Sequence, residues 1–346
     1  MYSINFPKTI VLELTYKCNH KCLFCSCPWE NDLENFPKYE KGTELNLAQW
    51  KQALDILAKQ GVKNVSISGG EALLKPELMD ILGYIREKNI LNKGTSIVLI
   101  SNGLAMNEDF IALFKKQKVH LSLSLPGLET FEKHTGHDNA KGVLHWLSRA
   151  KAEGITTTVS VTVTDINYHE LYETMAHGLI AGADTVLLNR FLIGGRGIKY
   201  KEELSLNKEQ LNGMLDTAER ILTKSKRWGS IGTEYPLCMI SRGKKSYKCL
   251  SIGSLCAAAT DFFVIDPSGF IRVCNHSPRK IGHIFDKEII TDKEYWNTFA
   301  NRNYLPASCL NCKDIKYCDC GCREVASIVS GSISAKDPCL LCMESV

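Results

Sequence analysis

The stretch Cys18-Asn19-His20-Lys21-Cys22-Leu23-Phe24-Cys25 decides how the rest of this sequence is interpreted. Three residues separate its first two cysteines and two separate the last two, so one tight loop is able to place three thiolates around a single inorganic cluster. A [4Fe-4S] cluster takes four ligands, and three thiolates therefore leave one iron open to a small molecule, much as a catalytic zinc site keeps one position free. The run follows the apolar stretch Ile10 to Thr15, which we predict to be a strand.

The composition is that of an ordinary globular protein and excludes several classes. The chain has 346 residues and a formal net charge of +4. This charge is too small and too dispersed to indicate a nucleic-acid or membrane-surface partner. No apolar run reaches transmembrane length, and the segment after Met1 does not resemble a signal peptide. We therefore predict a cytoplasmic protein.

The 15 cysteines need an explanation. Four lie between Cys18 and Cys27, and eleven lie between Cys238 and Cys342. Their odd number, their close spacings and the large chain favour metal ligation in a reducing compartment over disulfides. The uneven distribution predicts two metal-bearing regions joined by a metal-free scaffold.

Between these regions, strand-like and helix-like segments alternate. Apolar spacing predicts further strands at 65–68, 96–100, 119–125, 156–163 and 185–192, and helices at 47–60, 76–88, 108–116, 140–153, 169–180 and 211–222. Polar segments predict a loop at 30–44 and a connector at 199–205. Six strands alternating with helices indicate a parallel sheet with its helices outside. An eight-fold barrel needs about 250 residues, so we predict an open, partial (β/α)6 barrel.

Informative motifs fall where the predicted strands end. Ser68-Gly69-Gly70-Glu71 follows the second strand, Ser101-Asn102-Gly103 the third, and Ser124-Leu125-Pro126-Gly127 the fourth. Ligands of parallel β/α folds gather at this edge. The two glycines allow a ligand to approach the backbone closely, and Glu71 offers an acceptor for an amine. Alternatively, these residues form a plain turn, and the serine hydroxyls satisfy local backbone groups.

The second half of the chain is organised by cysteine spacing. Residues 262–273 read as a β-hairpin with a Pro-Ser-Gly turn, which brings Cys256 and Cys274 together at its feet. Downstream, two, five, three and sixteen residues separate the members of a second set: Cys309, Cys312, Cys318, Cys322 and Cys339. With Cys249 this makes eight thiolates, enough for two clusters with four ligands each. A pair such as Cys309 and Cys312 alone favours zinc.

Together these motifs resemble the radical S-adenosylmethionine (SAM) superfamily with a C-terminal SPASM domain. The resemblance implies that Cys18, Cys22 and Cys25 hold the cluster whose open iron chelates SAM. It also implies that the Gly-Gly-Glu motif holds the SAM ammonium group, with Ala72 in place of the usual proline. The other cofactor-binding residues it implies are Ser101, Asn102, Ser124 and, beside the adenine, Phe24. Pro126 replaces the aspartate of many relatives, which weakens the transfer of detailed active-site roles. The segment Asn189 to Gly197 resembles one after strand six of peptide-modifying relatives, although its glycines are also consistent with a turn.

The SPASM resemblance implies two auxiliary [4Fe-4S] clusters, hence three in all. The family's interleaved pattern assigns one to Cys249, Cys256, Cys274 and Cys322, and the other to Cys309, Cys312, Cys318 and Cys339. Cys27, Cys238, Cys320 and Cys342 are left over. Cys342 is an alternative to Cys339. A leftover thiol is most often a small buried hydrophobe; Cys238, in the connecting region, is our candidate for a catalytic hydrogen-atom donor or labile ligand.

We divide the chain into a barrel at 1–205, a connecting helix at 206–235 and an auxiliary-cluster domain at 236–346. The resemblance implies an oxidoreductase that makes a 5′-deoxyadenosyl radical and crosslinks, epimerises or oxidises a ribosomally made peptide or protein. Reduced flavodoxin or ferredoxin would supply electrons. Since about ten residues precede the first strand, we expect the peptide to be recognised by the barrel mouth, the second domain or a separate leader-binding protein. Alternatives are a small metabolite such as a sugar, sulfatase maturation, or a non-enzymatic zinc-ribbon or ferredoxin-like module.

Overall fold

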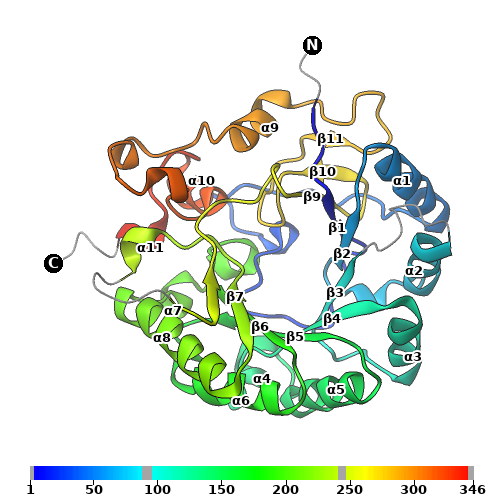
Figure 1. The fold of residues 1–346 in the computed structure, drawn as a ribbon. Coiled ribbons are helices and arrows are strands. Elements are labelled where there is room, and N and C mark those ends of the chain that lie inside the picture. Colours follow the sequence, from blue (N-terminus) through cyan, green and yellow to red (C-terminus); the bar gives the residue numbers. More distant parts are fainter. Residues whose placement is uncertain (1–3, 88–95, 241–246, 342–346) are drawn as a thin grey trace.

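The computed structural model describes residues 4–87, 96–240 and 247–341. The six predicted strands are present: β1 (Thr9–Glu13), β2 (Asn64–Ser68), β3 (Ile97–Ser101), β4 (Val119–Ser124), β5 (Thr157–Val163) and β6 (Thr185–Arg190). They pair in chain order and in parallel. Figure 1 shows them as a curved sheet with helices on its outer side. The predicted open α/β barrel is therefore confirmed.

The outer helices owe their positions to amphipathic spacing. They are α1 (Leu47–Lys59), α2 (Leu78–Glu87), α3 (Glu108–Gln117), α5 (Ala140–Ala152), α6 (Leu171–Ile180) and α8 (Lys208–Ser225). In α1, for example, Trp50, Ala53, Leu54 and Leu57 are buried, which are the positions that one helical face presents every three or four residues. Asn46 caps this helix in a reciprocal box with Gln49.

The cysteine-rich half extends the same sheet at both edges. β7 (Trp228–Ile231) and β8 (Leu250–Ile252) continue it beyond β6, and β9 (Phe262–Ile265) pairs in parallel with β1. β10 (Phe270–Arg272) forms the predicted hairpin with β9, and β11 (Gly282–His283) ends the sheet. In the described part of the chain the sheet has eleven strands, in the order β11-β10-β9-β1-β2-β3-β4-β5-β6-β7-β8. Because β7 lies within the predicted connecting helix at 206–235, the position of the domain boundaries stays a prediction.

Several predicted ends of helices and strands were wrong, mostly where a helix begins with polar residues. The connector at 199–205 contains the short helix α7 (Lys201–Leu204), in which Leu204 is fully buried. Helix α8 begins at Lys208 rather than Leu211, since Asn207 and Gln210 form a capping box. Pro76 precedes α2 instead of lying in its first turn. The end of the predicted 76–88 helix, Lys88, lies outside the described residues. The sixth strand ends at Arg190, because Phe191 and Leu192 turn away to pack with Val325 and Ile328.

The remaining helices are short: α4 (Phe131–Thr135), α9 (Lys293–Ala300), α10 (Arg323–Ser330) and α11 (Pro338–Leu341). Figure 1 shows α10 and α11 between the two ends of the curved sheet, while the loop after β1 crosses its enclosed side. The barrel edge, that loop and the cysteine-rich segments thus face one another. Among the described residues no helix has the length and apolarity needed to cross a membrane.

Candidate active site

The three-cysteine loop is fastened to the turn after β2. The Gly70 N–H donates to the carbonyl of Thr15 at 2.8 Å, and the Glu71 N–H donates to that of Lys17 at 2.8 Å. A Cβ atom on Gly70 would lie 2.2 Å from the Lys17 oxygen, closer than any real contact. Gly69 has φ +142°, and its Cβ would lie 2.8 Å from the Thr15 oxygen. The two glycines are therefore needed for the approach of the chain's own backbone, in addition to any ligand.

The three thiols of the loop lie within electrostatic range of one another. Burial is the main cause that raises the pKa of Cys18 to about 11, and the charges of Glu71 and Cys25 contribute to this rise. Burial also raises the pKa of Cys22, with contributions from Cys25 and Cys18. The neighbouring Cys27 lowers the pKa of Cys25, so this thiol ionises more readily than the other two. Cys18 and Cys22 resist ionisation, and a bound cation would hold them as thiolates, because metal binding releases the protons of its thiol ligands. This donor set fits an iron–sulfur cluster.

Glu71 is committed to partners within the protein. The carboxylate is 2% exposed and accepts hydrogen bonds from the Ser101 hydroxyl at 2.8 Å, the Asn102 N–H at 2.8 Å and the Leu73 N–H at 3.1 Å. Burial raises its pKa against the lowering effect of these donors. Glu71 thereby positions the turn after β3, and its role as an acceptor for the SAM ammonium group stays a prediction.

The turn after β3 in turn reaches the cysteine loop. The Asn102 amide nitrogen lies 3.9 Å from the Cys18 sulfur and donates to the Asn19 side-chain oxygen at 2.8 Å. The structure thus brings together four of the predicted site residues: Cys18, Glu71, Ser101 and Asn102. Ser101 is the last residue of β3, and the other three lie in loops that follow β1, β2 and β3, at the carboxyl edge where the sequence placed them.

The remaining cofactor-binding predictions have other surroundings. Ser124 ends β4, is half-buried and lies in register with Ser160. Phe24 packs 5.6 Å from the His134 ring, measured between centroids, and joins the small apolar cluster of Phe191 and Leu192. Their proposed contacts with SAM stay predictions.

The turn after β4, where Pro126 departs from the family pattern, is held by the segment after β5. The Asn167 amide donates to the Pro126 carbonyl at 2.8 Å. The Glu170 carboxylate accepts the N–H groups of Leu128 at 3.0 Å and Glu129 at 2.8 Å, as well as that of Thr130 at 3.0 Å. This carboxylate therefore orders the turn without the aspartate that many relatives have there.

Arg196 is a residue whose role the sequence analysis missed. Its guanidinium donates to the Cys22 carbonyl at 3.2 Å and forms an ion pair with Glu30. The flanking glycines allow close contact: the Gly197 N–H donates to the Cys25 carbonyl at 3.1 Å, and a Cβ on Gly195 would lie 2.6 Å from the same oxygen. The segment after β6 therefore holds the cysteine loop in place through hydrogen bonds to two of its carbonyl groups. The signal in the sequence was the Gly-Arg-Gly triplet, which lies in the segment that we interpreted as similar to one after strand six of peptide-modifying relatives or, alternatively, as a turn.

A cavity of about 290 Å³ lies at the foot of the hairpin, on the carboxyl side of β7 and β8. Cys256, Cys274 and Cys322 line it, as predicted for one auxiliary cluster, together with Glu234 and Glu324. The structure does not bring Cys249 to this cavity. Its sulfur instead accepts a hydrogen bond from the Thr223 hydroxyl at 3.6 Å.

Five thiols line a second cavity of about 30 Å³: Cys238, Cys309, Cys312, Cys318 and Cys320. Cys309, Cys312 and Cys318 were predicted to share a cluster, but Cys238 and Cys320 were left over in the sequence analysis. The Cys320 N–H donates to the Cys318 sulfur at 3.3 Å, and a hydrogen bond from Cys320 lowers the pKa of Cys318 to about 6. Cys339 does not line this cavity, and Cys342 lies outside the described residues.

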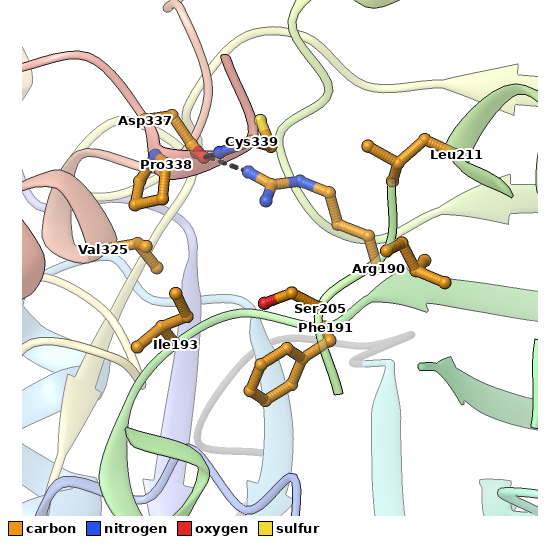
Figure 2. Close-up of a pocket in the computed structure, with 10 residues that line it drawn as sticks. Arg190, Phe191, Ile193, Ser205, Leu211, Val325, Asp337, Pro338 and Cys339 are labelled. Carbon is orange, nitrogen blue, oxygen red and sulfur yellow. Dashed lines mark hydrogen bonds and ion pairs between the residues drawn. The ribbon is translucent and has the colours of Figure 1, made fainter. Parts of the chain in front are cut away.

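Cys339 instead lines a cavity of about 60 Å³ beside Arg190 and Asp337. Figure 2 shows the Arg190 side chain directed at the Asp337 carboxylate, 2.5 Å away, with Ile193 and Val325 on the apolar side of this cavity. Arg190 ends β6, whereas Asp337 accepts the N–H groups of Cys322 at 2.7 Å and Cys339 at 2.9 Å. This ion pair therefore joins the barrel to the cysteine-rich segment.

A second buried ion pair joins the hairpin to the barrel. Arg272 of β10 contacts Glu13, the last residue of β1, and both side chains are at most 2% exposed. Asn275 donates to the other Glu13 oxygen at 3.0 Å. Since the cysteine loop follows β1 directly, the two regions share a support. Within residues 4–87, 96–240 and 247–341, no three His, Cys, Asp or Glu side chains are arranged to hold a single metal ion.

The fold and the cysteine loop define an enzyme of the radical SAM class. The family model described as "Radical SAM superfamily" matches residues 12–177. This span runs from β1 to α6 and includes the cysteine loop and the turns after β2, β3 and β4. Residues 12–177 are thus a domain of the radical SAM superfamily, whose enzymes use SAM with an iron–sulfur cluster.

Curated relatives match almost the whole chain. The PqqA peptide cyclase of Rhodopseudomonas palustris is 26% identical over 353 residues, covering 97% of this chain and 87% of the relative. The PqqA peptide cyclase of Gluconobacter oxydans is also 26% identical, covering 96% of this chain and 90% of the relative.

Solved structures share the fold. Streptococcus suis SuiB bound to its precursor peptide SuiA has a TM-score of 0.71 and 17% identity, covering 96% of this chain and 75% of SuiB. The structure of anSMEcpe with bound AdoMet and Kp18Cys peptide has a TM-score of 0.73 and 17% identity, covering 98% of this chain and 95% of anSMEcpe.

Proposed function

We propose that this enzyme is a maturase that modifies a ribosomally made precursor peptide by radical chemistry. The observation that carries the proposal is the length of the similarity to PqqA peptide cyclases, which includes the cysteine-rich half as well as the barrel. Two enzymes of the same fold that were solved with a bound peptide support this substrate class. The peptide would be crosslinked, epimerised or oxidised.

In this proposal Cys18, Cys22 and Cys25 hold a [4Fe-4S] cluster with one iron open to SAM. When bound and reduced, these cofactors supply a 5′-deoxyadenosyl radical that abstracts hydrogen from the substrate. The chain's own residues set the geometry. Glu71 orients the Asn102 amide toward Cys18, and Arg196 fixes the loop through the Cys22 carbonyl.

Arg196 also has an electrostatic role. Its guanidinium contacts the Cys22 carbonyl, and its charge lowers the pKa of Cys22 and of Cys25 against the effects of burial. A fixed positive charge beside the thiolates offsets part of their mutual repulsion. Gly69, Gly70, Ser101, Ser124 and Phe24 complete the proposed SAM site.

We further propose two auxiliary [4Fe-4S] clusters. The cavity of Cys256, Cys274 and Cys322 fits one of them, since three thiols converge there in a space of about 290 Å³. Cys309, Cys312 and Cys318 line the place of the other, for which Cys339 is the fourth ligand implied by the family pattern. These clusters would take the electron that the substrate loses. Cys238 lies beside the second cluster, which favours a role as labile ligand over that of a hydrogen donor at the barrel mouth.

We infer a reduced flavodoxin or ferredoxin as electron donor, because the chemistry consumes one electron at a low potential. The reducing conditions that free thiols and iron–sulfur clusters require favour a cytoplasmic location. A separate leader-binding protein is the further partner that we propose for delivery of the peptide.

Anaerobic reconstitution of the full chain tests this function. We expect about twelve iron atoms per chain, from three clusters of four, and dithionite-dependent formation of 5′-deoxyadenosine from SAM. Incubation with a small peptide encoded beside the gene is expected to change its mass or, for epimerisation, to introduce deuterium from heavy water. Bound zinc without SAM cleavage would reject the enzyme, and turnover of a sugar instead of the peptide would reject the substrate class.

A further inference from the structure

Strands β7 and β8 lead to the cavity lined by Cys256, Cys274 and Cys322, which we call the first auxiliary cavity. Residues that precede these strands and residues that follow them lie at opposite edges of the sheet. β7 and β8 run in parallel, with Gly229 opposite Leu250 and Ile231 opposite Ile252. Cys249 comes immediately before β8, whereas Cys256 follows it by four residues. At about 3.3 Å per residue, the strand alone separates the two ends by roughly 10 Å. Cys249 is therefore at the amino edge of the sheet, and the cavity is at the carboxyl edge.

Cys249 is also held where it is by helix α8. The Glu219 carboxylate accepts the backbone N–H of Cys249 at 3.0 Å, and those of Lys248 at 2.8 Å and Leu250 at 3.0 Å. Thr223, one helical turn further on, donates to the Cys249 sulfur at 3.6 Å. Moving this thiol to the cavity would break each of these contacts and the start of β8.

Glu234 is at the correct edge. It follows β7 by three residues and lines the cavity with Cys256, Cys274 and Cys322. The Cys256 thiol is close enough to the Glu234 carboxyl group to lower the pKa of that group against the effect of burial. Its charge also acts on all three thiols, raising the pKa of Cys256, of Cys274 and of Cys322 in addition to burial. Three thiols and one carboxyl group thus converge.

The backbone of Glu234 is fixed by the buried Arg190. The Arg190 Nε donates to the Glu234 carbonyl at 3.1 Å, and the Arg190 N–H donates to the Thr233 hydroxyl at 3.2 Å. The other carboxylate of the cavity, Glu324, is already bonded to the Tyr295 hydroxyl at 2.6 Å. Glu324 is therefore held by a side chain that does not line the cavity, whereas among the described residues Cys256 is the thiol that interacts with the Glu234 carboxyl group.

We propose that Glu234 supplies the fourth, oxygen ligand of the auxiliary cluster held by Cys256, Cys274 and Cys322, and that Cys249 is not a ligand. The inference rests on the proposed function in so far as this cavity holds an iron–sulfur cluster. Carboxylate is an accepted ligand of iron, and one oxygen among three thiolates makes the irons inequivalent. The cluster then differs in spectrum and potential from one with four thiolates.

The test uses the full chain in which Cys18, Cys22 and Cys25 are replaced by alanine, so that only the auxiliary clusters remain. In this background Glu234→Gln, Glu234→Cys and Cys249→Ser are compared by iron and sulfide content, by EPR of the reduced protein and by redox titration. Circular dichroism melting verifies that each variant folds.

We expect Cys249→Ser to leave the iron content, the EPR signals and the potentials unchanged. Glu234→Gln should change the EPR signal of one auxiliary cluster and lower its iron, whereas Glu234→Cys should retain about eight irons per chain with an altered signal and potential. A spectral change in Cys249→Ser, or no change in both Glu234 variants, would overturn the assignment.

Failure of the proposed function is a different result. It would appear in the unsubstituted enzyme as the absence of 5′-deoxyadenosine formation or of peptide modification, which the Glu234 variants do not decide. Absence of iron from the three-alanine background would overturn the Glu234 assignment together with the proposed auxiliary clusters, because the cavity would then hold no cluster. SAM cleavage and peptide modification by the unsubstituted enzyme would still be decided separately.

Discussion

The guanidinium of Arg190 lies 2.5 Å from the carboxylate of Asp337, 147 residues further along the chain, and both side chains are at most 4% exposed. Asp337 also accepts the N–H groups of Cys322 and Cys339. One buried carboxylate thus orients two of the cysteine segments and binds them to the end of β6. Burial and hydrogen bonding are both extensive here, so the arrangement depends on both partners being present.

Replacement of Asp337 by alanine leaves the Arg190 charge buried without its partner. We expect a loss of about 3–5 kcal/mol in the free energy of unfolding, together with lower retention of auxiliary-cluster iron. Denaturant titration and iron analysis measure the two effects. The exposed pair of Glu108 and Arg149 is a matched control, and Glu108→Ala should leave the melting temperature nearly unchanged. Equal effects of the two substitutions would contradict this account of the buried pair.

Substitution of Gly70 by alanine should disrupt the cysteine loop, because the new Cβ would lie 2.2 Å from the Lys17 oxygen. We expect at least a tenfold loss of 5′-deoxyadenosine formation and less iron bound by the loop. Gly83→Ala is the control: Gly83 lies in α2 with no atom within 4 Å of its Cβ position, and alanine should stabilise the helix by about 0.5–1 kcal/mol. Full activity of Gly70→Ala would refute the close approach.

Replacement of Cys18, Cys22 or Cys25 by alanine should abolish formation of 5′-deoxyadenosine and remove about four irons per chain. Cys27, two residues beyond the loop, donates to the Gly69 carbonyl at 3.8 Å and has no ligand role in the proposal. Cys27→Ala should therefore retain these irons. SAM cleavage by a Cys22 variant at the native rate would disprove the assignment of the loop.

Acid should destabilise the fold through His134. Its ring is fully buried between the Thr130 carbonyl and the Thr164 hydroxyl, at 3.1 and 2.9 Å, and burial lowers its pKa to about 4 from an ordinary value of 6.5. The unfolded chain therefore binds a proton at a higher pH than the folded chain. The contribution of the neutral ring is complete above pH 6.5 and is lost as the pH falls toward 4.

Urea titrations of His134→Gln between pH 7 and pH 4.5 measure this contribution. The glutamine variant should be less stable at neutral pH but should lose less stability on acidification. The surface residue His145, replaced by glutamine, serves as control. A parallel pH dependence of the His134 variant and the native chain would show that another group is responsible.

Much of the barrel was predictable because its signals are local. Apolar periodicity located each strand and outer helix, and the hairpin at Phe262–Arg272 was recognisable from its Pro-Ser-Gly turn. The element ends were less accurate where caps are polar, as at Asn207. The loop of Cys18, Cys22 and Cys25 was likewise predictable from the sequence, since all three of these thiols belong to one short segment.

The sequence by itself determined the alternation of strands and helices, the three-cysteine loop and the two cysteine-rich regions, because each depends on spacing within a short stretch. Only the tertiary structure decided that one continuous sheet joins both halves. It also decided that Arg196 hydrogen-bonds to the cysteine loop, and that Glu234 rather than Cys249 lines the first auxiliary cavity. These relationships join residues far apart in the chain, and their geometry follows from strand direction and burial, which spacing along the sequence does not encode.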